Sequence, residues 1–184
     1  MFDAQIAKYR SLNQLAEADG TVIFGTSSDV NIPLGELKQA FALNDSIYNR
    51  SFSELSVADA ARVYGECVAE LCPDTVIVHI GDADVSDFGY KETAFEENYR
   101  TLIGTIREKN KDCRIVIVSL KNYDNDITVA EINKLLGEIA DSAAKKKAVC
   151  EGISCAVEQD LIRQLSGMAQ KGTIDRNQQS LLKA

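Results

Sequence analysis

The sequence of 184 residues has one histidine, two prolines and no tryptophan, and its 28 acidic residues outnumber its 20 basic ones. The formal charge of −8 excludes nucleic acid as a main partner, because binding a phosphate backbone requires a basic face. No apolar run approaches the roughly 20 residues of a membrane span, and the N-terminal segment lacks the apolar centre of a signal peptide. We therefore expect a cytoplasmic protein with no membrane or nucleic-acid partner.

Metal and redox motifs are also missing. None of the five cysteines lies in a Cys-x-x-Cys pair, and a single histidine cannot complete the usual zinc sets. An odd number of cysteines in a cytosolic chain predicts free thiols in or near the core. We expect no metal and no cofactor. The cysteines are Cys67, Cys72, Cys113, Cys150 and Cys155.

The sequence is rich in apolar runs that alternate with amphipathic segments. Runs of β-branched residues predict buried strands, and apolar residues three and four apart predict helices. This alternation predicts one three-layer α/β/α domain over residues 1–184 with a parallel sheet. An N-terminal helix within 1–19 and a helical tail over 156–184 complete it. We expect strands at 21–25, 46–48, 75–80, 114–120 and 148–150, and helices at 3–18, 34–43, 57–71, 92–109, 129–146 and 156–169, with Ser56 and Thr128 as N-caps.

The stretch from Thr21 to Asn31 carries the strongest functional signal. A buried strand ends at Gly25, and a turn of small polar residues follows before the next helix. Open α/β sheets hold their ligands at the carboxyl ends of strands. The serines of this turn either contact a ligand there or satisfy loop amides and cap the next helix. The polar residues are Thr26, Ser27, Ser28, Asp29 and Asn31.

Three stretches in this order resemble the SGNH (GDSL-type) hydrolase family. In that family a strand ends in Gly-Asp-Ser, whose serine is the nucleophile, and Gly25-Thr26-Ser27 stands in that place. A later loop begins with an asparagine and supplies a glycine amide that helps bind the oxyanion. Here that loop begins at Asn49, and Ser53 or Glu54 stands where the glycine is expected.

The third motif of the family is Gly-x-Asn-Asp after a strand. The matching residues are Gly81 and Asp84, with Ala83 in place of the oxyanion asparagine. The resemblance implies a flavodoxin-like fold and hydrolysis of a carboxylic ester, such as an acyl or acetyl ester on a carbohydrate or lipid. It makes Ser27 the nucleophile, with its own backbone N–H and a loop amide near Ser53 or Glu54 as oxyanion donors.

The fourth motif, Asp-x-x-His near the C-terminus, has no match. The one histidine, His79, lies inside a predicted strand, and we expect it to be buried and hydrogen-bonded rather than catalytic. A serine without a base is a weak nucleophile, and a substitute could be Asp84, Asp82 or Asp29, or could come from a partner chain. The sequence therefore leaves two hypotheses, an ester hydrolase and an inactive relative that binds a small ligand or a protein partner at the same edge.

A third hypothesis rests on the acidic residues. Asp29, Asp82, Asp84 and Asp87 could gather at the carboxyl edge of the sheet and hold Mg²⁺ for phosphoryl transfer, with Ser119 and Lys121 nearby. Solvated loop aspartates are the simpler interpretation of the same residues. The tail after residue 172 could pack on a neighbouring subunit, so a homo-oligomer is among the expected partners.

Overall fold

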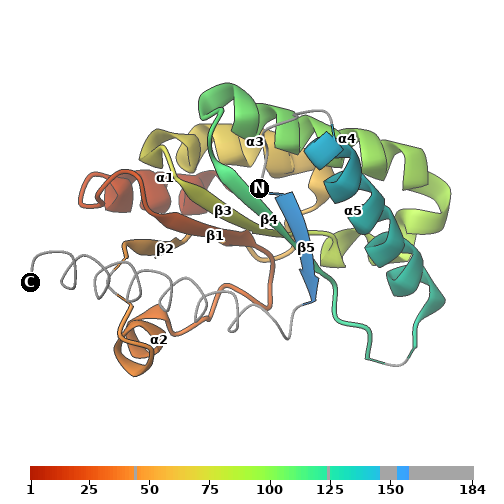
Figure 1. Ribbon diagram of the computed structural model, residues 1–184, viewed down its shortest axis with the longest axis horizontal. Coiled ribbons are helices and arrows are strands. Elements are labelled where there is room, and N and C mark those ends of the chain that lie inside the picture. Colours follow the sequence, from red (N-terminus) through yellow and green to blue (C-terminus); the bar gives the residue numbers. More distant parts are fainter. Residues whose placement is uncertain (44, 124, 146–152, 158–184) are drawn as a thin grey trace, which may run out of the picture.

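The computed structural model describes residues 1–43, 45–123, 125–145 and 153–157. Its strands form one parallel sheet in the order β2-β1-β3-β4-β5 (Figure 1). The predicted parallel sheet is therefore confirmed. The strands are β1 (Thr21–Gly25), β2 (Ile47–Asn49), β3 (Thr75–His79), β4 (Arg114–Ser119) and β5 (Ile153–Val157).

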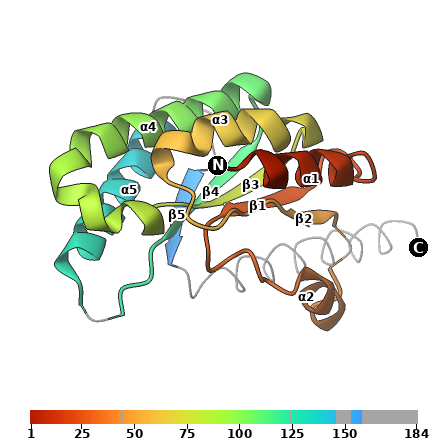
Figure 2. The ribbon, with the colours of Figure 1, turned by 180° about the vertical axis from the view of Figure 1, so that it is seen from behind.

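Helices cover both faces of the sheet, which makes the predicted three-layer sandwich. One face carries α1 (Asp3–Asn13), α3 (Val57–Cys67), α4 (Phe88–Lys109) and α5 (Ile127–Lys145). Helix α2 (Leu34–Ala40) lies on the opposite side, and both views show this division (Figures 1 and 2). Two short 3₁₀ helices, η1 (Ala69–Leu71) and η2 (Asp82–Asp87), follow α3 and β3. In the part of the chain that the structure describes, no helix has the length and apolarity needed to cross a membrane.

The middle residues of β1, β3 and β4 are apolar because both faces of the sheet are buried there. Side chains alternate between the faces with a period of two. Val22 and Phe24 of β1 join the large core under α1, α3, α4 and α5. Ile23 of the same strand joins a smaller core with Ile77, Val116 and Val118. The two cores fix the register of the central strands.

Helix boundaries differ from the predictions in five helices. Helix α2 ends at Ala40 rather than 43, and α5 begins at Ile127 rather than 129. Helix α1 ends at Asn13 rather than near residue 18, because Leu15 in the predicted extension is 86% exposed and adds no buried contact. Helix α3 ends at Cys67, and the predicted last turn is the separate η1. Helix α4 begins at Phe88 rather than 92, with non-helical backbone at Lys91.

One predicted N-cap is wrong, and the other is correct in position only. Asp126, not Thr128, caps α5, since its Oδ1 accepts the N–H groups of Thr128 and Val129 at 2.7 and 3.3 Å. Ser56 occupies the N-cap position of α3, as predicted, but its side chain makes no cap hydrogen bond. The carboxylate of Asp84, from the loop after β3, accepts the first N–H of that helix instead. A distant residue therefore supplies the cap that the local sequence suggested.

The last predicted elements also differ. Strand β2 is shifted by one residue from the predicted 46–48, and β5 runs over Ile153–Val157. Strand β5 therefore occupies the first two positions, 156 and 157, of the helix expected at 156–169. The strand expected at 148–150, the rest of that helix and the tail to residue 184 lie outside the described residues.

Candidate functional site

Three adjacent strands bring the three matched stretches to one edge of the sheet. Strands β2, β1 and β3 are neighbours and parallel, so their carboxyl ends lie together. Ile23 pairs with Asn49, and Gly25 pairs with His79. The loops that follow these strands carry Ser27, Glu54 and the residues from Gly81 onward. This edge of the sheet is the candidate site.

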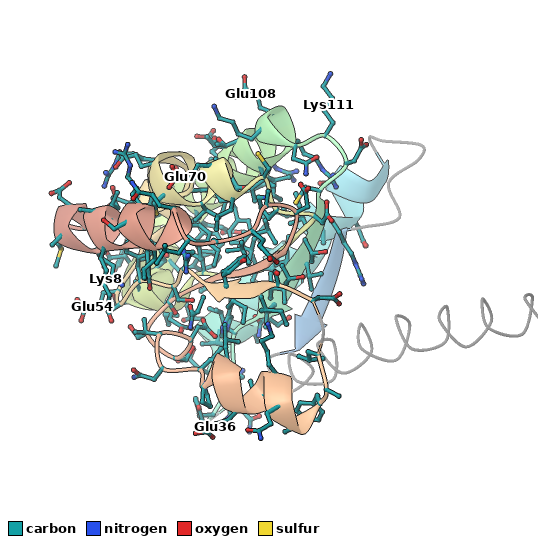
Figure 3. All side chains as sticks on the ribbon, turned by 90° about the vertical axis from the view of Figure 1, so that its left-hand side faces the viewer. Lys8, Glu36, Glu54, Glu70, Glu108 and Lys111 are labelled. Carbon is teal, nitrogen blue, oxygen red and sulfur yellow. The ribbon has the colours of Figure 1, made fainter. Side chains whose placement is uncertain are left out.

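Ser27 is exposed at the tip of the turn after β1. Its Oγ accepts the backbone N–H of Glu54 at 3.1 Å. Glu54 has a φ of 57°, a left-handed conformation that glycine adopts most easily. Its side chain points outward from the ribbon (Figure 3). A backbone amide therefore faces the Ser27 hydroxyl from the second loop, while Ser28 and Ser53 are exposed.

The residues behind Ser27 form a buried network. His79 is 1% exposed and Asp29 is 3% exposed. Nδ1 of His79 lies 2.9 Å from Oδ2 and 3.1 Å from Oδ1 of Asp29. Because a carboxylate oxygen only accepts, Nδ1 carries the proton of this bond. The prediction of a buried, hydrogen-bonded histidine is confirmed.

The same carboxylate closes the turn. Oδ2 of Asp29 accepts the backbone N–H of Thr26 at 3.0 Å. It fits above Gly25 only because glycine has no side chain, since a Cβ there would lie 2.0 Å from Oδ2 of Asp29. Nδ2 of Asn49 donates to the backbone carbonyl of Asp29 at 2.7 Å, and the Ser51 hydroxyl accepts the Gly25 N–H at 3.1 Å. Neither Ser51 nor the link from Asp29 to His79 was predicted.

The loop after β3 joins the turn through a hydroxyl. Oγ1 of Thr26 donates to Oδ2 of Asp82 at 2.8 Å. Gly81 has a φ of 140°, and a Cβ there would lie 3.2 Å from Leu120, so glycine suits this position. Thr26, which replaces the aspartate of the family motif, thus ties the first loop to the third.

The carboxylate of Asp84 is hydrogen-bonded to the start of α3. Its Oδ2 accepts the N–H of Val57 at 3.0 Å. Burial, only partly offset by this hydrogen bond, raises the pKa of Asp84 to about 6. The carboxyl lies in a pocket of about 160 Å³ between η2, α3 and α4. The residues lining it include Ala83, Phe88 and Phe95.

The four aspartates do not share a centre. Asp29 binds His79, Asp82 binds Thr26 and Asp84 binds the start of α3. Asp87 pairs with Lys91 at 2.8 Å, which lowers the pKa of Asp87. Among the described residues, no group of three or more carboxylate, cysteine or histidine side chains is placed to hold a metal ion. The geometry does not support the magnesium hypothesis.

Comparison with known proteins relates the chain through its fold. No protein-family model matches the chain, and no curated protein matches it. A solved structure described as a platelet activating factor from Streptococcus pneumonia is similar with a TM-score of 0.68 at 16% identity, over 84% of this chain and 73% of that chain.

Two further structures agree with the first. A GDSL-like lipase from Bacteroides thetaiotaomicron has a TM-score of 0.58 at 17% identity, over 83% of this chain and 77% of that one. A carbohydrate esterase of family 3 from Talaromyces cellulolyticus has a TM-score of 0.57 at 16% identity, over 75% and 78% of the two chains. The chain therefore has an SGNH/GDSL hydrolase-like fold, as the motifs predicted.

Proposed function

We propose that the protein binds a carboxylic ester, such as an acyl or acetyl ester of a carbohydrate or lipid, at Ser27 without hydrolysing it efficiently. The observation that carries this proposal is the placement of the only histidine. His79 is buried and its Nδ1 is bonded to Asp29, whereas Ser27 is exposed with its Oγ on the Glu54 amide.

The ester-binding part rests on Ser27 and Glu54. Backbone N–H groups aimed at one point stabilise an oxygen that carries negative charge. The Glu54 N–H reaches the Ser27 hydroxyl at 3.1 Å, so an ester carbonyl seated against Ser27 would meet the same amide. Similar folds described as esterases and lipases support an ester as the ligand class.

The lack of efficient hydrolysis follows from the missing base. The chain holds no second histidine anywhere in its sequence. The nearby carboxylates have other partners, since Asp82 accepts from Thr26 and Asp84 accepts from Val57. Loss of one triad member costs about four to six orders of magnitude in rate. Ala83 also lacks the side-chain donor of the family motif.

Ester hydrolysis by Ser27 is the second candidate. The exposed hydroxyl beside a backbone N–H favours it, because Glu54 adopts the left-handed conformation suited to the glycine of the family loop. In this candidate a carboxylate of the edge, Asp82 or Asp84, takes the proton of Ser27. The raised pKa of Asp84, about 6, makes it a stronger base than an ordinary aspartate.

One pair of assays separates the candidates. Hydrolysis of p-nitrophenyl acetate is measured for the wild type, Ser27→Ala and His79→Ala, with the exposed neighbour Ser28→Ala as matched control. Binding of ethyl acetate is followed through the backbone amide resonances of Ser27 and Glu54. The proposal expects saturable shifts that Ser27→Ala weakens and Ser28→Ala does not, with hydrolysis equal to that of the buffer. Hydrolysis lost specifically in Ser27→Ala would establish the second candidate instead.

A further inference from the structure

We propose that the buried pair of Asp29 and His79 is a positioning device that holds the Ser27 turn in its binding orientation. The inference rests on the proposed function, because it assigns the turn a role in holding a ligand. Neither residue is placed to touch that ligand, since both residues are at least 97% buried. They act through the backbone on which Ser27 stands.

The turn is closed twice between the same two residues. The backbone N–H of Asp29 donates to the carbonyl of Thr26 at 3.0 Å. In the other direction, the N–H of Thr26 donates to the Asp29 carboxylate, also at 3.0 Å. Ser27 and Ser28 are the two central residues of this turn, so their orientation follows from how Asp29 is held.

The sheet holds Asp29 from both sides. His79 lies at the end of β3, in register with Gly25 of β1, and its Nδ1–H donates to the carboxylate that occupies the space above Gly25. Asn49, at the end of β2, donates to the Asp29 carbonyl. Residues at the ends of two strands thus fix one aspartate, and that aspartate fixes the turn between them.

A buried carboxylate needs its donors because leaving one unsatisfied is costly. Without the Nδ1–H of His79, the carboxylate of Asp29 would turn toward solvent or rearrange, and the Thr26 N–H would lose its acceptor. The essential contribution of His79 is therefore one N–H donor at the Nδ1 position. A role in general packing would instead depend on the size of the side chain.

Two variants of His79 distinguish these roles. In His79→Asn the amide nitrogen can occupy the position of Nδ1, whereas in His79→Gln it lies one bond farther out, near the position of Nε2. Both variants remove the imidazole ring. Positioning predicts that His79→Asn preserves the turn and that His79→Gln does not, although glutamine is closer to histidine in size.

The readout is amide hydrogen exchange at Thr26 in the full chain without ligand, with Ile117 in β4 as a reference for global opening. We expect His79→Gln and His79→Ala to speed exchange of the Thr26 amide about tenfold to a hundredfold relative to Ile117. This is the effect of losing one hydrogen bond to a charged acceptor. His79→Asn stays within about threefold of the wild type. Asp29→Asn keeps the shape of the side chain and removes its charge, so it should also speed exchange of the Thr26 amide. This variant replaces the His79 variants as the test if they fail to fold.

Equal acceleration in the Asn and Gln variants, or none at Thr26 in His79→Ala, would overturn the inference. The affinity for ethyl acetate is then measured on the same variants and should fall in the order of their Thr26 exchange rates. Ser27-dependent ester binding that is unchanged in His79→Gln would refute the positioning role while leaving the proposed function intact. Absence of ester binding in the wild type would refute the proposed function, whatever the exchange rates show.

Discussion

Replacing Gly25 by alanine tests the packing of the buried pair. The new Cβ would lie 2.0 Å from Oδ2, 2.6 Å from Cγ and 3.0 Å from Cβ of Asp29. The carboxylate therefore has to leave its place between His79 and Thr26. Breaking a buried pair while one partner stays buried costs about 3–5 kcal/mol. For a chain of this size we expect the melting temperature to fall by roughly 6–20 °C.

Urea unfolding followed by circular dichroism measures the loss in the free energy of unfolding. Gly104→Ala in the exposed middle of α4 is the matched control, since a Cβ there meets nothing within 4 Å. That variant should gain about 0.5–1 kcal/mol in helix stability. In an Asp29→Ala background only the contact with Cβ remains, so Gly25→Ala should cost about 2 kcal/mol less there. An equal effect at Gly25 and Gly104 would refute the packing argument.

Three further predictions concern other parts of the site and its support. Asp84, whose pKa burial raises to about 6, contributes stability that is fully present below its ordinary pKa and is lost as the pH rises through about 6. The wild type should therefore gain stability relative to Asp84→Asn in urea unfolding as the pH falls from about 7 to 4. Arg50→Ala should destabilise by about 2–3 kcal/mol in the same assay, because the buried guanidinium stacks on Tyr9 and Tyr48 at 5.1 and 5.5 Å; a loss no larger than that of Arg62→Ala on the surface would contradict this. Glu54→Gly should raise the melting temperature by relieving about 1 kcal/mol of left-handed strain and should keep ester binding; weaker binding would show that the glutamate side chain contributes.

Much of the fold is visible in the sequence because buried parallel strands need continuous apolar runs. The segments at β1, β3 and β4 have such runs, and each is found within one residue of its predicted end. The start of α4 was missed because Phe88 stands next to Gly89 in an acidic segment without helical periodicity. In the structure, hydrogen bonds join the three loops at one edge, from Glu54 to Ser27 and from Thr26 to Asp82.

The missed features depend on partners far along the chain. Asp84 caps α3 from 27 residues away, and His79 lies 50 residues from Asp29. The local sequence indicates that Ser56 suits an N-cap position and that His79 is buried. It does not indicate which distant side chain forms a hydrogen bond at each place. One signal in the sequence was available for the contact of Asp29 with Gly25. A glycine at the end of a buried strand, followed four residues later by an aspartate, indicates space above the strand for the aspartate side chain.

The most direct test of the central claim combines one probe with one mutation. The amide resonances of Ser27 and Glu54 are recorded during titration with ethyl acetate, in the wild type and in Ser27→Ala, while p-nitrophenyl acetate hydrolysis is measured on the same samples. We predict saturable shifts at both amides, weakened by Ser27→Ala, with hydrolysis at the rate of buffer alone. Ser27-dependent turnover above the buffer rate, or the absence of any saturable shift, would contradict the account.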